Sequence, residues 1–159
     1  MFRDISTLLS DPEGLNEVIT KLKDTYSNEK YNFEYIIGIE ARGFIVGAAL
    51  AYALNKGFIM IRKSGKLPGA VVSADYQLEY GTDKIEMHAD AFPKGSRVIL
   101  FDDLLATGGT MLGAANLIEK LGGEILEMVV IVNLPDIGGA TKLKERGYKV
   151  SYLCEFEGD

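Results

Sequence analysis

The chain has 159 residues, of which 47% are hydrophobic, so it is long and apolar enough to fold as a globular domain rather than remain disordered. Its formal net charge is −6, whereas general binders of nucleic acids or anionic membranes are usually basic, so neither partner is expected. The single Cys154 and the single His88 exclude an internal disulfide and argue against a histidine-based metal centre, and this composition fits a reducing cytoplasm.

The apolar segments and the N-terminus give no sign of a membrane or secreted protein. The longest apolar segment, residues 44–54, is too short to span a bilayer, and we expect a helix that is buried on most sides. The first residues include the acidic Asp4 and no cleavage pattern, so we do not expect a signal peptide.

Strands and helices are predicted to alternate along the chain. Asp11 followed by Pro12 predicts a helix start, and apolar residues then recur on one helical face as far as Tyr26. The strands are expected at residues 35–39, 58–61, 97–101, 126–134 and 149–154, and the later helices at residues 44–54, 110–121 and 139–146. Because the strands are continuous apolar runs, the pattern predicts an α/β fold with a parallel sheet that is covered by helices on both faces.

Residues 62–95 interrupt this alternation and contain no good helix. Alternating apolar residues on either side of Gly81, Thr82 and Asp83 predict an extended hairpin that turns at these three residues. A long non-helical excursion in a compact domain is usually a functional lid or flap. No linker or internal repeat divides the remainder, so residues 1–159 are expected to form a single domain with this flap.

The segment VILFDDLLATGGTM, residues 98–111, places Asp102 and Asp103 shortly before a small, glycine-containing turn at residues 106–110. Backbone N–H groups in such a turn, together with the N-terminus of the following helix, attract an anion such as phosphate. Taken alone, the turn can equally be an ordinary helix start. The adjoining carboxylates favour a ribose 5-phosphate, because its hydroxyls and a bound Mg²⁺ can offset their charge. The sequence patterns of a dinucleotide site and of a nucleoside-triphosphate P-loop are both missing.

Basic residues follow two other predicted strands. Arg42 lies in EARGF, residues 40–44, and Arg62, Lys63 and Lys66 lie in RKSGKLPG, residues 62–69. Ordinary surface roles are the alternative for each group, but the carboxyl ends of parallel strands meet at one edge of a sheet, where ligands bind. A phosphate turn, an acidic pair and a basic loop at one edge together indicate a phosphorylated sugar that carries a second polyphosphate.

These segments resemble a known family. FDDLLATGGT resembles the motif with which type I phosphoribosyltransferases bind phosphoribosyl pyrophosphate (PRPP). GIEARGF, IRKSGKLPG, YQLEYGTDKIEMHADA and MFRDIS resemble segments of the adenine phosphoribosyltransferases within that family, and the resemblance runs from residue 1 to about residue 135. It implies a mainly parallel five-stranded sheet with helices on both faces, a β-ribbon flap and a small N-terminal hood.

The resemblance also implies an activity: transfer of the phosphoribosyl group of PRPP to adenine, which gives AMP and pyrophosphate. It implies Mg²⁺ that is held mainly by PRPP rather than by protein ligands, and a homodimer. Two alternatives stay open, namely a transferase for another purine (xanthine, or hypoxanthine and guanine) and a non-catalytic regulator that binds PRPP. Relatives usually carry a further segment before FRDIS, so the base-binding hood is expected to be incomplete here.

The resemblance assigns the sugar and its phosphates to particular residues. It implies that Asp102 and Asp103 face the ribose hydroxyls. The 5-phosphate is expected to bind Ala106, Thr107, Gly108, Gly109 and Thr110. The pyrophosphate is expected to bind Ala41, Arg42, Arg62, Lys63 and Lys66, some of them from a partner subunit.

The resemblance assigns the base and its proton to residues near the N-terminus and on the flap. Phe2 and Arg3 are expected to bind adenine, and Glu79 is expected to manage a proton on the base, with Asp102 and Asp103 completing the catalytic set. Tyr80 is expected on the flap that closes over the site. A cis peptide bond is implied between Glu40 and Ala41.

Overall fold

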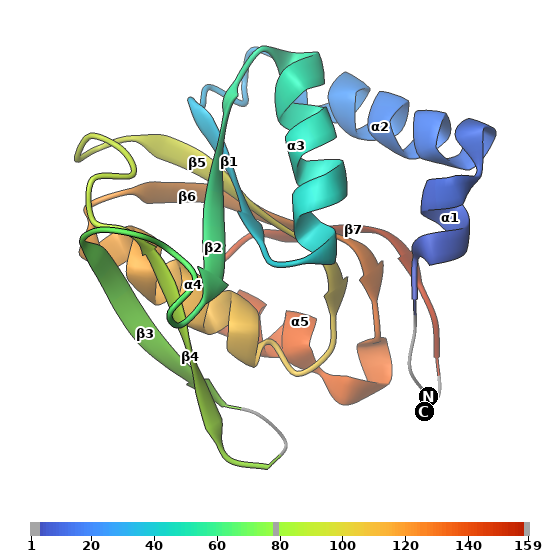
Figure 1. Cartoon of the computed structure of the whole chain (residues 1–159). Coiled ribbons are helices and arrows are strands. Elements are labelled where there is room, and N and C mark those ends of the chain that lie inside the picture. Colours follow the sequence, from blue (N-terminus) through green and yellow to red (C-terminus); the bar gives the residue numbers. More distant parts are fainter. Residues whose placement is uncertain (1–3, 78–79, 158–159) are drawn as a thin grey trace.

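The computed structural model describes residues 4–77 and 80–157 of the chain. Within these residues, seven strands form one sheet in the order β3-β4-β2-β1-β5-β6-β7 (Figure 1). The strands are β1 (Tyr35–Ile39), β2 (Gly57–Lys63), β3 (Val71–Gln77), β4 (Thr82–His88), β5 (Arg97–Leu105), β6 (Glu124–Asn133) and β7 (Val150–Glu155).

The parallel part of the sheet is the one that the apolar runs predicted. Strands β2, β1, β5, β6 and β7 pair in parallel. The ribbon of β3 and β4 is antiparallel, and it joins the edge of this sheet because Arg62 and Lys63 of β2 pair with Glu86 and Ile85 of β4. The flap therefore extends the sheet, within the described residues, from five predicted strands to seven.

Helices cover both faces of the sheet, as predicted (Figure 1). The helices α1 (Ser6–Ser10), α2 (Pro12–Tyr26) and α3 (Arg42–Leu54) lie on one face, and α4 (Gly109–Lys120) and α5 (Gly139–Glu145) lie on the other. The start of α2 is the predicted one, because the carboxylate of Asp11 accepts a hydrogen bond from the N–H of Glu13 and Pro12 occupies the first helical turn. The short α1 and a single 3₁₀ turn, η1 (Pro135–Ile137), were not predicted.

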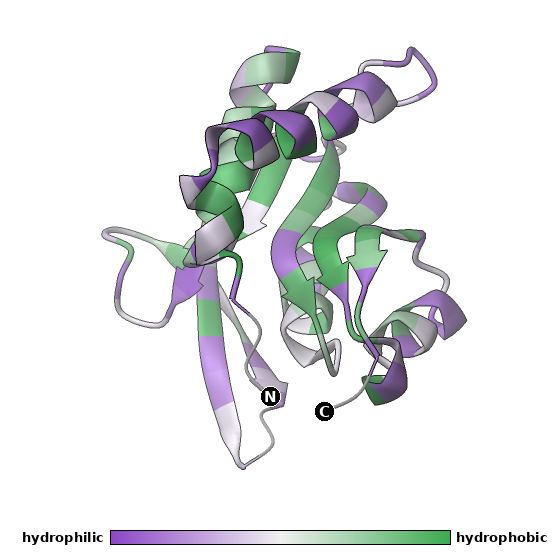
Figure 2. Ribbon diagram, turned by 90° about the vertical axis from the view of Figure 1, so that its right-hand side faces the viewer, coloured by the Kyte–Doolittle hydropathy of each residue, from purple (hydrophilic) through white to green (hydrophobic). Residues whose placement is uncertain are grey.

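The core is divided by the sheet into two layers. Successive strand residues point to opposite faces, so Ile36 packs beneath α2 and α3 whereas Ile37 packs against the layer that contains α4. The same alternation holds for Ile99 and Leu100 in β5. Figure 2 shows these apolar strands and the hydrophilic outer residues of α2, whereas α3 is largely apolar. Within the described part of the chain, no helix combines the length and the hydropathy needed to cross a membrane.

Two strands continue beyond their predicted ends. We expected β2 to end at residue 61 and β5 at residue 101, with the charged residues in the loops that follow. Instead, Arg62 and Lys63 belong to β2, and Asp102 and Asp103 belong to β5. Backbone pairing continues through the polar residues, since Asp102 still pairs with Val130 of β6. A strand therefore holds each of these side chains in place.

The hairpin turn also differs from the prediction. Gln77 pairs with Thr82 and Tyr76 pairs with Asp83, so Thr82 and Asp83 belong to β4 and not to the turn. Gly81 has a φ of 88°, a left-handed conformation that favours glycine at this point.

Candidate active site

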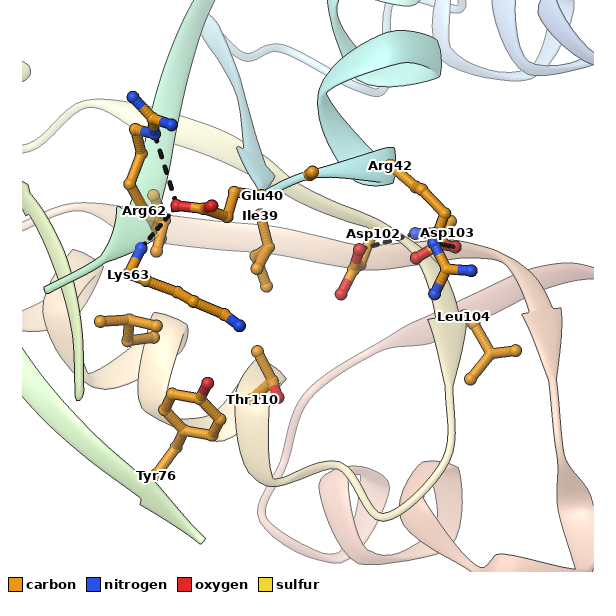
Figure 3. A pocket seen from close by; sticks show the side chains of 13 residues that line it. Ile39, Glu40, Arg42, Arg62, Lys63, Tyr76, Asp102, Asp103, Leu104 and Thr110 are labelled. Carbon is orange, nitrogen blue, oxygen red and sulfur yellow. Dashed lines mark hydrogen bonds and ion pairs between the residues drawn. The ribbon is translucent and has the colours of Figure 1, made fainter. Parts of the chain in front are cut away.

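The predicted motifs meet at the carboxyl edge of the parallel strands, around a cavity of about 200 Å³ (Figure 3). The ends of β1, β2 and β5 form most of its wall, and Tyr76 and Ile85 of the ribbon and Thr110 of α4 complete it. The lining residues are Ile39, Glu40, Ala41, Arg42, Ile61, Arg62, Lys63, Tyr76, Ile85, Asp102, Asp103, Leu104 and Thr110. Predicted residues from three separate segments of the sequence thus share one cavity.

The glycine turn forms a second, adjoining cavity of about 160 Å³. Its lining includes Ala106, Thr107 and Gly108, and it shares Asp102 and Thr110 with the first cavity. The turn ends at the N-terminus of α4, where the N–H groups of the first helical turn and the helix dipole favour an anion. The N–H of Gly109 donates a 3.3 Å hydrogen bond to Oγ1 of Thr107 in this structure. The two cavities therefore offer room for a ligand that has a phosphate at one end.

Glycines shape this turn. Gly108 caps α4 with a φ of 85°, which residues with a side chain rarely adopt. A Cβ on Gly109 would lie 2.8 Å from the carbonyl oxygen of Gln77, so the end of β3 packs directly on the turn. Gly139, at the start of α5, approaches from beneath: its N–H donates a 3.0 Å hydrogen bond to the carbonyl of Ala106, and a Cβ there would lie 2.3 Å from that oxygen. Sequence reasoning missed Gly139, because no local pattern indicates this long-range approach.

The acidic pair lies at the end of β5. Asp103 is buried with 5% exposure, and its Oδ2 lies 2.9 Å from Nε of Arg42. Its backbone N–H donates a 2.8 Å hydrogen bond to Oδ1 of Asp102. Burial, and then the charge of Asp103, raise the pKa of Asp102 well above its ordinary value. Asp102 therefore holds a proton more readily than a free aspartate, which lessens the repulsion between the two carboxyl groups.

Arg42 belongs to the acidic side of the cavity in this structure (Figure 3). Besides Asp103, its guanidinium contacts Asp4, with Nη1 at 3.6 Å from Oδ1. Asp4 in turn accepts hydrogen bonds from the N–H and the hydroxyl of Ser6, and these bonds lower its pKa. Sequence reasoning missed this role of Asp4, which links the N-terminal segment to Asp103 through Arg42. The predicted contact of Arg42 with pyrophosphate stays a prediction.

Glu40 organises the basic side of the cavity, and it too was missed. Its Oε1 accepts a 2.7 Å hydrogen bond from the N–H of Lys63 and lies 3.4 Å from Nε of Arg62, while its Oε2 lies 3.9 Å from Nζ of Lys66. The peptide bond from Glu40 to Ala41 is cis, as the resemblance implied. Arg62, Lys66 and the backbone of Lys63 therefore meet at the carboxylate of Glu40, a residue of the EARGF motif to which sequence reasoning assigned no role.

The remaining predicted residues lie apart from this cavity or outside the described structure. Tyr80 lies on the ribbon, and its side chain is exposed. Glu79, Phe2 and Arg3 lie outside the described residues. Within residues 4–77 and 80–157, no group of three or more His, Cys, Asp or Glu side chains is arranged to hold a metal ion.

The sheet order, the ribbon and the glycine turn together define the class of protein: its fold is that of the type I phosphoribosyltransferases. The family model for the phosphoribosyl transferase domain matches residues 4–157, and the chain therefore belongs to the phosphoribosyltransferase family.

Adenine phosphoribosyltransferases are among the proteins most similar to this chain. The adenine phosphoribosyltransferase of Chlorobium phaeobacteroides is 63% identical over 159 residues, which cover 100% of this chain and 90% of the relative. The crystal structure of adenine phosphoribosyltransferase from Thermoanaerobacter pseudethanolicus has a TM-score of 0.92 and 44% identity, covering 98% of this chain and 88% of that one. The crystal structure of adenine phosphoribosyltransferase from Trypanosoma brucei in complex with AMP, pyrophosphate and ribose-5-phosphate has a TM-score of 0.89 and 28% identity. The match covers 97% of this chain and 69% of that one.

Proposed function

We propose that this chain transfers the phosphoribosyl group of PRPP to adenine and releases AMP and pyrophosphate. The observation that carries the proposal is the division of the joined cavities into a phosphate turn, an acidic pair and a basic cluster, each suited to one part of PRPP. The relatives named above favour adenine over xanthine, hypoxanthine or guanine, and they favour an enzyme over a regulator without turnover.

The sugar end of PRPP is assigned to β5 and the turn that follows. The 5-phosphate accepts hydrogen bonds from backbone N–H groups at the start of α4, where the helix dipole also favours it. The ribose hydroxyls face the acidic pair. The residues assigned to the 5-phosphate are Ala106, Thr107, Gly108, Gly109 and Thr110, and those assigned to the ribose are Asp102 and Asp103.

The pyrophosphate is assigned to Arg62, Lys63 and Lys66 on the other side of the cavity, together with Ala41 and with Arg42, which lies beside Asp103 in this structure. A Mg²⁺ ion fits this arrangement, because Mg²⁺ is commonly bound by one or two carboxylates together with substrate phosphates. Asp102 and Asp103 are the carboxylates that would hold it, and most of its oxygen ligands would come from PRPP. When bound, the ion supplies positive charge that neutralises the departing pyrophosphate.

The reaction exchanges one bond at C1 of the ribose for another. The bond from C1 to the pyrophosphate oxygen breaks, and the electron pair leaves with the pyrophosphate, towards Arg62, Lys63 and Lys66. C1 develops oxocarbenium character and bonds to N9 of adenine, which loses its proton. We assign Glu79 to that proton, and we assign Tyr80 to the flap that keeps water from C1. Phe2 and Arg3 are assigned to the adenine ring and its edge.

The proposal also includes the oligomeric state and the location of the protein. Each chain forms one transferase domain, two chains form a homodimer, and the dimer acts in the cytoplasm. The outer face of α3 supports self-association, because Ile45 and Tyr52 are 51% and 89% exposed and Met60 of the adjacent β2 is 40% exposed. A second copy of the chain would cover these apolar side chains. The cytoplasmic location rests on the single cysteine and on the small-molecule substrates.

A pyrophosphate-release assay tests the activity. The purified chain is incubated with PRPP, Mg²⁺ and, in separate reactions, adenine, hypoxanthine, guanine and xanthine. We expect release with adenine at a rate at least about a hundredfold above the other bases, since a mismatched base edge leaves buried polar groups unpaired. Binding of PRPP without release for any base would instead indicate a regulator.

A further inference from the structure

Glu40 places a carboxylate where the site is proposed to bind an anion. The residue lines the main cavity, and its side chain is 12% exposed. Figure 3 shows its contacts with Arg62 and with the backbone N–H of Lys63, and its Oε2 also lies near Nζ of Lys66 at the distance given above. The proposed function assigns the side chains of Arg62 and Lys66 to pyrophosphate, so Glu40 and pyrophosphate share these two cationic partners.

This position has two opposite consequences. As a hydrogen-bond acceptor and counter-ion, Glu40 gathers the start of the basic loop and fixes the N–H of Lys63. As a negative charge beside an incoming polyphosphate, it weakens the attraction that Arg62 and Lys66 exert. The first effect improves the geometry for binding, whereas the second lowers the affinity.

The loop has supports that do not depend on Glu40. The N–H of Gly65 donates a 2.6 Å hydrogen bond to Oε1 of Glu86, and the N–H of Ser64 donates a 3.0 Å hydrogen bond to the carbonyl of Lys84. A glutamine at position 40 would keep an amide oxygen for the N–H of Lys63. The charge of Glu40 can therefore be removed while the loop keeps its hydrogen bonds.

We propose that Glu40 is a positioning residue whose negative charge limits the affinity of the site for pyrophosphate. It holds Arg62, Lys63 and Lys66 in place and offsets part of their charge, so that pyrophosphate binds weakly enough to leave after transfer. This inference rests on the proposed function, because it takes the basic cluster to be the pyrophosphate site.

The test compares Glu40→Gln with the wild type and with a matched control, Glu34→Gln. Glu34 also accepts a backbone hydrogen bond, from the N–H of Arg97 at 2.6 Å, but it lies at the opposite end of β1. Calorimetric titration with pyrophosphate and Mg²⁺ should show Glu40→Gln binding on the order of tenfold more tightly than the wild type. In steady-state assays, its KM for PRPP and its inhibition constant for pyrophosphate should fall together, while Glu34→Gln stays at the wild-type values.

A purely structural role would not lower KM, since a disordered loop binds its ligand less well. Glu40→Ala also removes the charge, so it should tighten pyrophosphate binding as well, to a smaller extent because it loses the contact with Lys63. The inference is overturned if Glu40→Gln and Glu40→Ala both fold but bind pyrophosphate no more tightly than the wild type. The proposed function still stands in that case, provided that the wild type uses adenine and PRPP. A wild type that neither binds pyrophosphate nor uses adenine would overturn both.

Discussion

At the scale of single residues, each side of the site pairs a carboxylate with cations. Arg42 lies with Asp103 on one side, whereas Arg62 and Lys66 lie with Glu40 on the other. The proposed function assigns the ribose hydroxyls to the first side, because hydroxyl groups donate to carboxylates, and the pyrophosphate to the second, because it accepts from cations.

Asp103→Asn should weaken PRPP binding by about tenfold to a hundredfold. An amide accepts hydrogen bonds from ribose hydroxyls less strongly than a carboxylate, and a charged hydrogen bond contributes about 1.5–3 kcal/mol. Calorimetric titration with PRPP measures the change. Asp24→Asn, on the exposed surface of α2, is the control and should bind PRPP like the wild type. Unchanged binding by Asp103→Asn would contradict its assignment to the ribose.

At the scale of elements, the phosphate turn depends on the start of α5. Gly139→Ala would place a methyl group against the carbonyl of Ala106, and the turn would have to shift. We expect a loss of about 1–3 kcal/mol in unfolding free energy, as for other overpacked sites, and a higher KM for PRPP. Denaturant titration and steady-state kinetics measure the two effects. The control is Gly14→Ala in α2, where the new methyl group would meet the side chains of Leu8 and Asp11 and not the phosphate turn, so KM should stay unchanged. A normal KM for Gly139→Ala would show that α5 does not shape the turn.

A second link between elements lies at the opposite edge of the sheet. Glu127 of β6 is 1% exposed, and its Oε1 lies 2.9 Å from Nζ of Lys149, which precedes β7 and also contacts the hydroxyl of Tyr31. The hydrogen bond to Glu127 raises the pKa of Lys149. Since the folded-state pKa is raised, the stabilisation is complete below the unfolded-state pKa of about 10.4 and is lost as the pH rises through the folded-state value.

Lys149→Met should therefore lower the unfolding free energy by about 1–3 kcal/mol at pH 7, because the buried carboxylate of Glu127 loses its counter-ion. The loss stays moderate because the side chain of Lys149 is partly exposed and solvent weakens the ion pair. The difference between the variant and the wild type should begin to shrink above a pH of about 10.4, where the lysine of the unfolded state loses its charge, and should disappear as the pH rises through the raised folded-state pKa. Urea titrations at a series of pH values measure this difference. Lys142→Met, at an exposed position of α5, is the control and should unfold like the wild type at every pH. If the stability loss in Lys149→Met does not change with pH, the cause is lost packing and not the ion pair.

The elements also show how far the sequence alone was informative. Apolar runs predicted the parallel strands, and Tyr35–Ile39 agrees with its predicted bounds. The ends of β2 and β5 were wrong, because pairing with neighbouring strands carries polar residues into the ladder. Motifs named many of the residues that line the two cavities, but they did not indicate the contacts of Glu40, Asp4 and Gly139. Their contacts join residues that are distant in the sequence, so no local spacing records them.

At the scale of the whole molecule, the proposed dimer predicts one consequence for the outer face of α3. Tyr52→Arg should shift the protein from dimer to monomer, because a charge would enter the buried contact, whereas in a monomer it would only replace an exposed side chain. Sedimentation velocity measures the shift. Thr141→Arg, exposed on α5, should not change the sedimentation of the wild type; a wild type that sediments as a monomer would contradict the dimer.

A crystal structure with AMP bound tests the central claim most directly, because AMP carries the phosphate, the ribose and the base in one molecule. The account predicts the phosphate at the start of α4, within hydrogen-bond distance of backbone N–H groups of Gly108, Gly109 and Thr110, with the ribose hydroxyls towards Asp102 and Asp103. A phosphate bound instead between Arg62 and Lys66, with the glycine turn free of ligand, would contradict it.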